Sequence, residues 1–282
     1  MPESRQVKSP GLLGRFLALP NDSNVKTVGI ALLVCLVCSL AVSTTVVGLK
    51  AVQIKRLGSD LRVTVLEVAG LLHPGSNPDR LFKQIETRMI DLTTGEYASG
   101  IDADEYDQRA AVRDKTLSNP ISKQHDIAGI NRRARYARVY LVREAGSIKC
   151  LVLPVYGKGF LSTMYGFIAL RPDGNTVCGL KFYEEKETPG MGGEVEDPKW
   201  LLLWRGKHIY DEAGNPAIQV IHGKVDAQSD SNIFEVDGLS GATMTSKGIT
   251  NLLHFWLGDL GFKKYLEKHF KTGEETGVRS EE

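Results

Sequence analysis

Residues 27–49 contain no charged side chain and are mostly apolar, with the sequence TVGIALLVCLVCSLAVSTTVVGL. As an α-helix this stretch would be about 34 Å long, whereas the hydrocarbon core of a bilayer is roughly 30 Å thick. The pattern therefore predicts one transmembrane helix at residues 27–49, preceded by a cytoplasmic segment of residues 1–26. Basic residues flank the stretch on both sides, so the charge bias alone does not decide its orientation.

The same stretch has a second interpretation as a cleavable signal peptide. Ala41, Val42 and Ser43 form the kind of small-residue site that follows the apolar core of such a peptide. The apolar run continues past this site, and the polar segment before it is long, which favours a retained anchor. Both interpretations export residue 51 and everything after it.

The region that follows the anchor has the pattern of helices and irregular chain. Residues 51–72 form a partly amphipathic run, residues 73–77 (HPGSN) break it, and a second helix is predicted at about residues 78–92. Residues 100–134 are polar and have no regular period. We therefore predict a support region at residues 50–136, without chemistry of its own.

From Ala137 the pattern changes to short runs rich in β-branched and aromatic residues, separated by turn residues. These runs are ARVYLVRE, IKCLVLPVYG, MYGFIALRP, TVCGLKFYEE, AIQVIHG and IFEVDG. They predict a mixed or antiparallel sheet, so the fold class is α+β: one N-terminal transmembrane helix, then an exported sheet domain with flanking helices.

The C-terminal part has apolar residues at helical spacing from Thr245 to about Lys271, with Gly258 and Gly261 expected to bend or split the helix. The last residues are charged and are expected to fray. We place the sheet domain at residues 137–256 and the C-terminal helix and tail at residues 257–282.

Composition excludes several classes of protein. With 282 residues and 42% hydrophobic content the chain has ample material for a core, and 35 basic against 34 acidic residues give no excess of charge that would attract nucleic acid. The six histidines are scattered without metal-ligand spacing, so no protein-bound metal is predicted. Cys150 and Cys178 lie in separate predicted strands and are able to pair only if those strands are neighbours.

The segment DGLSGATMTSKGI, residues 237–249, lies between the last predicted strand and the C-terminal helix. Gly241 and Ala242 would let a phosphate-bearing group approach the backbone and leave the hydroxyl of Thr243 uncrowded, while the start of the helix offers unpaired N–H groups to a phosphate. Thr245 or Ser246 is a candidate cap for that helix. Taken alone, the segment is typical of an ordinary strand-to-helix turn.

Two further segments change its interpretation. KETPGMGG, residues 186–193, follows a strand and has the glycine content of a loop that lies close to a flat ring. GKGFLSTMYGFIAL, residues 157–170, places glycines in a turn between two strands. Neither segment contains a GxxxxGK[ST] or GxGxxG motif, so no nucleoside triphosphate or NADH site is predicted.

The membrane anchor is followed by GKGFLSTMYGFIAL, KETPGMGG and SGATMTS in that order, which is the order seen in the C subunit of the sodium-translocating NADH:quinone oxidoreductase. The chain resembles that family over nearly its full length. The resemblance implies covalent FMN, attached through its phosphate to Thr243, the last residue of the [ST]GAT motif. The implied cofactor contacts are Ser240, Gly241, Ala242, Thr245, Glu187, Thr188, Gly190 and Gly192. The sequence departs from the pattern at Leu161, where a tryptophan is common, which weakens any expectation of aromatic packing there.

The resemblance further implies a role in a multisubunit respiratory complex of the bacterial inner membrane. The chain would relay electrons from NADH towards quinone, coupled to sodium export by partner subunits, with its C-terminal domain in the periplasm. A separate flavin transferase would attach the FMN. Two alternatives remain: the flavoprotein subunit of the related ferredoxin:NAD complex, and a membrane-anchored binding domain without redox chemistry.

Overall fold

The computed structural model describes residues 20, 23–73, 75–144 and 146–271. The chain divides into two compact units, one ending at Gly58 and one beginning at Ser59. Most of the predicted segment 1–26 and the charged tail lie outside the described residues. The boundaries predicted for the support region and the sheet domain stay predictions.

Helix α2 (Asn24–Val68) begins in the first unit and ends in the second. Its stretch Asn24–Leu49 has a mean hydropathy of 2.6 in its most apolar window, and no part of that window is buried inside the structure. By length and composition this stretch is able to cross a membrane, as the uncharged pattern predicts.

The C-terminal end of α2 packs against the sheet of the second unit. The helix ends at Val68, and Gly70, with a φ of 69°, allows the chain to reverse, while the N–H of Leu71 donates to the carbonyl of Leu66 at 2.9 Å. Val65 and Leu66 in the last turns of α2 have no exposed surface. The juxtamembrane helix is therefore partly a core element and not only a spacer.

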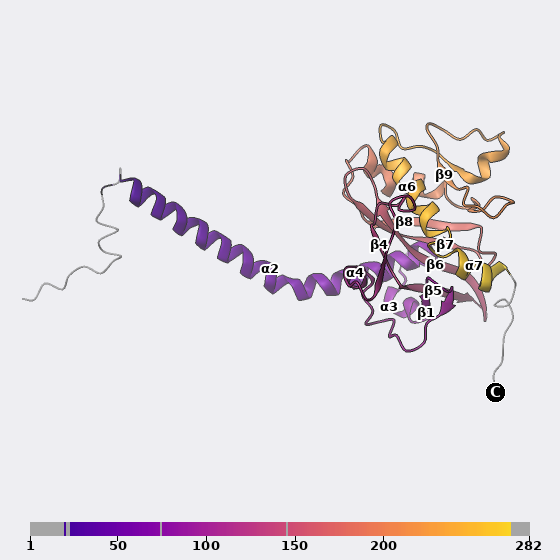
Figure 1. The fold of residues 1–282 in the computed structure, drawn as a ribbon, viewed down its shortest axis with the longest axis horizontal. Helices are drawn as coiled ribbons and strands as arrows, with labels where there is room; N and C mark the ends of the chain where they lie inside the picture. Colours follow the sequence, from indigo (N-terminus) through magenta and orange to yellow (C-terminus); the bar gives the residue numbers. More distant parts are fainter. Residues whose placement is uncertain (1–19, 21–22, 74, 145, 272–282) are drawn as a thin grey trace, which may run out of the picture. The chain divides into compact units, whose positions relative to one another are not determined.

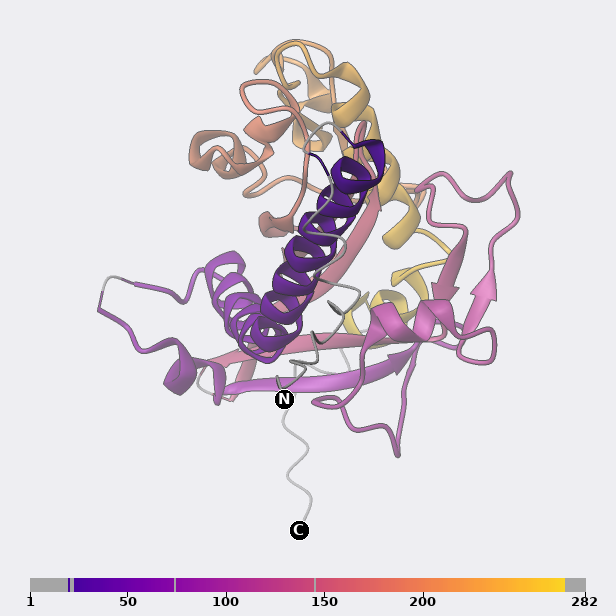
Figure 2. The same ribbon diagram turned by 90° about the vertical axis from the view of Figure 1, so that its left-hand side faces the viewer.

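A six-stranded sheet forms the centre of the second unit, with every neighbouring pair of strands antiparallel. Its spatial order is β2 (Glu96–Tyr97), β1 (Ile85–Asp91), β5 (Tyr136–Glu144), β6 (Ser147–Lys158), β7 (Thr163–Leu170) and β8 (Val177–Glu184). In both views β1 lies towards one end of this unit and the segment around β9 towards the other (Figures 1 and 2).

Smaller elements surround this sheet. Two short pairs of strands accompany it: β3 (Ser118–Pro120) with β4 (Arg132–Ala134), and β9 (Gln219–Val220) with β10 (Glu235–Val236). The α-helices are α3 (Pro78–Phe82), α4 (Gln108–Arg113), α5 (Pro198–Leu202), α6 (Thr243–Trp256) and α7 (Lys263–Leu266). The 3₁₀ helices η1 (Gly192–Glu196) and η2 (Asp230–Phe234) and the short π-helix η3 (Glu267–Lys271) accompany them.

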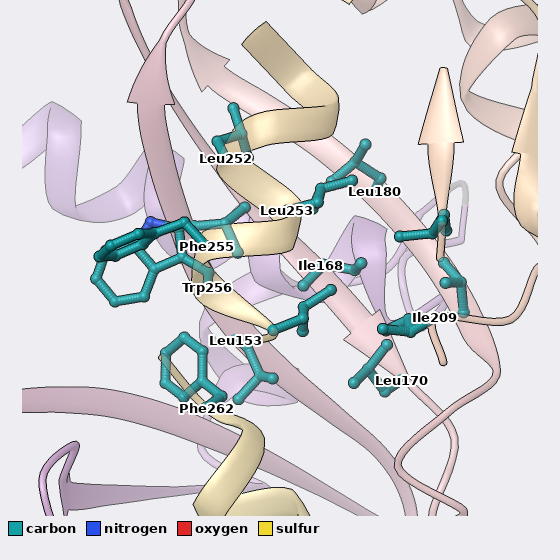
Figure 3. Packing of buried hydrophobic residues seen from close by; sticks show 14 of the residues in the cluster. Leu153, Ile168, Leu170, Leu180, Ile209, Leu252, Leu253, Phe255, Trp256 and Phe262 are labelled. Carbon is teal, nitrogen blue, oxygen red and sulfur yellow. The ribbon is translucent and has the colours of Figure 1, made fainter. Parts of the chain in front are cut away.

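Hydrophobic side chains form two separate clusters. The smaller one joins the end of α2 to β5, β6 and β7, through residues such as Val142, Val152 and Phe167. The larger one joins α6 to β6, β7 and β8 (Figure 3). In it, Leu252 and Leu253 of α6 have no exposed surface. Because successive strand residues point to opposite faces, the strands supply both clusters from one continuous sheet.

The predicted helix at residues 78–92 is wrong beyond its first turn. Helix α3 ends at Phe82, and Ile85–Asp91 form strand β1, which pairs along its whole length with β5. The sequence has the alternation that a strand requires, with Ile85, Thr87 and Met89 at every second position, but a run this short is also compatible with a helix. The pairing partner, about 50 residues further along the chain, decides between the two.

Other expectations are met in part. The four predicted runs between residues 137 and 185 form β5 to β8, whereas the runs at 217–223 and 233–238 contain only the two-residue strands β9 and β10. The C-terminal helix is interrupted between Trp256 and Lys263, in the segment that contains Gly258 and Gly261, as predicted.

Cys150 and Cys178 are both free thiols in the structure. Cys150 lies in β6 and Cys178 in β8, and β7 is inserted between these two strands. The two strands are therefore not neighbours, yet the two thiols are in contact: a hydrogen bond between them, together with burial, raises the pKa of Cys150. Pairing of the two cysteines stays a prediction.

Candidate functional site

The first turn of α6 presents an exposed threonine beside unpaired backbone donors. Thr243 is the first residue of the helix and is exposed. Among the described residues, the backbone N–H groups of Thr243, Met244 and Thr245 have no hydrogen-bond acceptor. The first turn contains no acidic side chain. This end of the helix is therefore suited to an anionic group, since its N–H groups and its dipole both favour negative charge.

The predicted helix cap is wrong. The N-cap position is Ala242, which makes no side-chain cap, because α6 begins two residues before Thr245. Thr245 and Ser246 lie inside the first turn instead. The Ser246 hydroxyl accepts a hydrogen bond of 3.3 Å from the N–H of Leu239 and holds the preceding turn.

Small residues allow the chain to pass closely around this turn. Gly241 has a φ of 68°, a conformation that favours glycine, and a side chain there would meet the Met191 methyl group at 3.2 Å. Gly248, one turn further along α6, lies against the carbonyl of Lys158, with 2.7 Å between that oxygen and the position a Cβ would take. The [ST]GAT turn is thus placed between the KETPGMGG loop and the end of β6.

Glu187 joins the three segments that the sequence singles out. Its carboxylate accepts hydrogen bonds from the backbone N–H groups of Phe160, Leu161 and Ser162, each at 3.1 Å. It also accepts a bond of 2.7 Å from the hydroxyl of Thr245. The side chain is buried, with 5% of the residue exposed. One carboxylate therefore connects the β6–β7 turn, the KETPGMGG loop and the first turn of α6.

This carboxylate is held in its charged form by donors and not by a cation. Burial by itself raises the pKa of a carboxyl group, but the bonds from Thr245 and from the N–H groups of Ser162, Leu161 and Phe160 outweigh it and lower the pKa of Glu187 below its ordinary value. Glu187 is thus ionised at neutral pH, and its oxygens are already engaged by the chain.

Glycines make room for this junction. A Cβ at Gly192 would lie 2.7 Å from the Thr245 hydroxyl and 2.9 Å from the Cβ of Glu187, and one at Gly159 would lie 2.5 Å from a Glu187 carboxylate oxygen. Real Cβ atoms do not approach other atoms so closely. The glycines of the two motifs are therefore needed for packing around Glu187.

The remaining predicted residues line the outside of the junction. Thr188 is exposed, and its carbonyl accepts from the N–H of Gly193 at 2.9 Å, which closes the loop. Gly190 has a φ of 75° and open space around it, and Ser240 is exposed beside Gly241. The structure thus brings Glu187, Gly192 and Thr245 into contact and leaves Thr188, Gly190, Ser240 and Thr243 at the surface.

Four exposed apolar residues belong to these same segments, and we call them the apolar rim. They are Phe160 (55% exposed) and Leu161 (58%) in the β6–β7 turn, Met191 (42%) in the KETPGMGG loop, and Met244 (59%) next to Thr243. Exposed apolar side chains beside an anion-binding helix end are complementary to a molecule with a phosphate and a flat apolar ring. The residues present therefore fit FMN.

Sequence reasoning missed the role of the β6–β7 turn. It expected Glu187 to lie near a flavin, which stays a prediction, but it did not foresee that the N–H groups of Phe160, Leu161 and Ser162 donate to its carboxylate. The available signal was the requirement that a carboxylate in a glycine-rich, apolar context finds several donors. Among the described residues, no group of three His, Cys, Asp or Glu side chains is placed to hold a metal ion.

Comparison with known proteins agrees with this geometry. Residues 159–258 match the family model described as FMN-binding domain. That match begins at the β6–β7 turn and ends just after α6, so it contains Glu187, Thr243 and the whole apolar rim. The fold and the site thus define the chain as a protein with an FMN-binding domain.

The chain belongs to the family of the C subunits of the Na(+)-translocating NADH-quinone reductases. The C subunit from Pseudomonas aeruginosa is 46% identical over 249 residues, which cover 87% of this chain and 95% of that protein. The C subunit from Vibrio anguillarum is 44% identical over 252 residues, which cover 89% of this chain and 97% of that protein.

Two crystal structures of such proteins are also similar to the chain. NqrC of Shewanella oneidensis has a TM-score of 0.69 and 37% identity, covering 74% of this chain and 95% of that one. The C subunit of the Na(+)-translocating NADH-quinone reductase from Parabacteroides distasonis has a TM-score of 0.59 and 25% identity. The match covers 77% of this chain and 96% of that one.

Proposed function

We propose that this chain is the flavin-carrying electron-relay subunit of a membrane-bound, sodium-translocating NADH:quinone reductase, with FMN bound covalently through its phosphate to Thr243. The observation that carries this proposal is the exposed hydroxyl of Thr243 beside three unpaired N–H groups at the start of α6. A phosphate esterified to this hydroxyl lies where the helix end stabilises its negative charge.

The neighbouring hydroxyl groups are less suitable for attachment. Thr245 is only 2% exposed and donates to Glu187, and Ser246 is 5% exposed and accepts from Leu239. Ser240 is exposed but precedes the helix, on the far side of Gly241. Thr243 alone of these four combines exposure with a position in the first turn.

Bound FMN supplies a reversible electron carrier, and the chain's own residues hold and surround it. With FMN bound, the first turn of α6 would hold the phosphate, and the apolar rim would pack against the ring and exclude water from it. Glu187 fixes the relative positions of these parts. Because its pKa is lowered and its oxygens are occupied, it acts as a fixed anchor of the turn and not as a proton carrier at neutral pH.

Attachment requires a separate flavin transferase. Among the described residues, the Thr243 hydroxyl has no hydrogen-bond partner that would serve as a base. A threonine hydroxyl is a weak nucleophile unless a base removes its proton. The transferase supplies that base, and the hydroxyl forms the ester bond to the phosphorus of a flavin donor as the donor's other phosphate group leaves.

The same proposal covers the location of the chain. Residues 24–49 anchor it in the bacterial inner membrane, the unit that begins at Ser59 lies in the periplasm, and the other subunits of the complex supply the sodium pathway and the neighbouring redox centres. A single helix cannot enclose an ion pathway, so sodium coupling depends on these partners.

Intact mass spectrometry of the denatured chain, expressed with its transferase, tests the proposal. The wild type and the Ser240→Ala control are expected to retain the mass and the in-gel fluorescence of one FMN, and Thr243→Ala is expected to lose both. The complex assembled with Thr243→Ala should lose quinone reduction by NADH. An unmodified wild type in the presence of active transferase contradicts covalent attachment.

Sodium-stimulated quinone reduction by the wild-type complex separates this function from the alternative in a ferredoxin:NAD complex. If the flavin-loaded chain supports electron transfer with ferredoxin but not with quinone, the proposed flavin site is correct and the proposed complex is wrong.

A further inference from the structure

A cavity lies under helix α4, outside the proposed FMN site. It has a volume of about 360 Å³, within the range of small-molecule pockets. Its floor is formed by β6, β7 and β8, through residues that include Pro154, Tyr156, Tyr165 and Tyr183. Thr243, Glu187 and the apolar rim do not line it. The cavity therefore has its own set of contacts.

Two of the residues that line this cavity each have a buried hydrogen-bonding atom without a partner. The hydroxyl of Tyr156 and the side-chain nitrogen of Gln108 have no hydrogen-bond acceptor or donor among the described residues. Tyr156 is 9% exposed. A buried polar group that stays unpaired costs about 1–3 kcal/mol, so a ligand or a water that supplies the missing partner would be favoured here.

Both groups are available as donors. The amide nitrogen of Gln108 is only a donor. Burial raises the pKa of Tyr156, so its hydroxyl keeps its proton at neutral pH. An occupant that satisfies both must carry acceptor atoms with free lone pairs, such as the oxygens of a carboxylate.

The walls favour a flat ring. The rings of Tyr156 and Tyr165 are stacked, with centroids 5.5 Å apart and an angle of 21° between their planes. The guanidinium carbon of Arg109 lies 3.8 Å from the centre of the Tyr165 ring. Planar groups therefore already pack face to face in this cavity, and another aromatic ring is able to extend the arrangement.

The charges favour an anion. Arg109 is paired with Glu184 at 2.8 Å, so these two lining residues offset each other. Arg113 also lines the cavity and has no carboxylate partner in the part of the chain that the structure describes. The lining thus carries one uncompensated positive charge.

We propose that this cavity binds a small aromatic carboxylate, with its carboxylate oxygens accepting from Tyr156 and Gln108 and its ring against the tyrosines. The site does not depend on the covalent flavin, because none of its lining residues belongs to the FMN-binding turn.

Calorimetric titration of the full-length chain in detergent with benzoate tests this site. Cyclohexanecarboxylate serves as the anion without an aromatic ring, and benzyl alcohol as the ring without a charge. Benzoate is expected to bind saturably with one molecule per chain. Both analogues are expected to bind at least about tenfold more weakly, since one lacks the aromatic ring and the other the carboxylate.

Two variants assign the binding to the cavity. Tyr156→Phe and Gln108→Leu should each weaken benzoate about tenfold, the loss expected for one hydrogen bond to a charged group. Tyr136→Phe removes a tyrosine hydroxyl outside the cavity and should bind as the wild type does. The same titration of Thr243→Ala should be unchanged, which separates this proposal from the function of the flavin site.

The stability of the variants without ligand gives an independent readout. Because the Tyr156 hydroxyl is unpaired, Tyr156→Phe should unfold at the same temperature as the wild type or higher. Three results would each overturn the proposal and indicate a cavity filled by water only. They are the absence of saturable binding up to about 100-fold excess of benzoate over the chain, equal binding of benzoate by Tyr156→Phe and the wild type, and a lower unfolding temperature of Tyr156→Phe.

Discussion

The first and last turns of α6 have opposite surroundings. At the first turn, Thr243 and Met244 are exposed, backbone donors are unpaired, and the principal contact is a hydrogen bond to a buried carboxylate. At the last turn, Phe255 and Trp256 are buried in the larger hydrophobic cluster, and the Trp256 ring nitrogen donates to the carbonyl of Tyr156 at 2.6 Å. One helix thus has a polar, accessible end and an apolar, closed end.

The difference separates function from stability along a single element. Burial of the last turn fixes the helix on the sheet, whereas the first turn leaves its hydrogen-bonding groups free for a ligand. Changes at the apolar end should therefore affect folding, and changes at the polar end should affect cofactor attachment. The following predictions test that division, beginning with the largest expected effect.

Trp256→Ala should be the most destabilising of these changes. Its side chain has no exposed surface, and truncation leaves a cavity among Tyr156, Phe255 and Phe262, so the free energy of unfolding should fall by about 3–5 kcal/mol. Chemical denaturation of the purified chain measures this. Met244→Ala, at the exposed end of the same helix, should change it by less than about 0.5 kcal/mol. Similar losses for both variants would break the comparison.

Glu187→Gln, which changes the carboxylate bonded to the polar end of α6, should have the next largest effect on the free energy of unfolding. The amide group of glutamine cannot accept at both positions, so one or more of the N–H groups of Phe160, Leu161 and Ser162 loses its acceptor, at a cost of about 2–3 kcal/mol. Glu194→Gln changes a carboxylate in the following turn that does not contact these N–H groups, and it serves as the control in the same denaturation experiment. A Glu187 variant as stable as this control would refute the role of Glu187 as the junction.

Gly248→Ala should move α6 away from β6. The added Cβ would lie 2.7 Å from the Lys158 carbonyl and 3.0 Å from the Gly159 Cα, and backbone atoms give way only by displacement of the helix. We expect a loss of about 1–2 kcal/mol of unfolding free energy and a lower yield of flavin attachment. Lys247→Ala, at the exposed neighbouring position, is the control. Full stability and full flavin loading of Gly248→Ala would show that the close approach is unnecessary.

The pH dependence of stability should show the smallest effect. The pKa of Glu187 is lowered in the folded state, so its stabilisation is complete above its ordinary pKa of 4.5 and is lost as the pH falls through the lower folded-state value. The difference in unfolding free energy between wild type and Glu187→Gln should therefore narrow as the pH falls below about 4.5. A difference that stays constant over this range would contradict the lowered pKa.

The sequence predicts those parts of the fold that local pattern controls. The uncharged run identifies the apolar helix, the strands from Ala137 onward follow from β-rich runs between turn residues, and Gly258 and Gly261 mark the interruption of the C-terminal helix. Strand β1 could not be predicted, because its pairing with β5 is a contact between distant parts of the chain that outweighs a locally ambiguous pattern.

The candidate site shows the same limit. The motif around Thr243 is visible in the sequence because small residues and a helix start occur together. The junction at Glu187 is not visible, because its donors come from a turn about 25 residues earlier and its hydroxyl partner from a helix 58 residues later. The cavity under α4 combines residues from four elements, and the sequence pattern of residues 100–134 gives no indication of it.

The identity of the modified residue tests the central claim most directly. Proteolysis of the wild-type chain, expressed with its transferase, and tandem mass spectrometry of the peptide that contains residues 240–246 would locate the added FMN. We predict that it lies on Thr243, which is exposed at the start of α6, and not on Thr245, which is buried and bonded to Glu187. FMN on Thr245 or Ser240, or none on this peptide, would contradict the account.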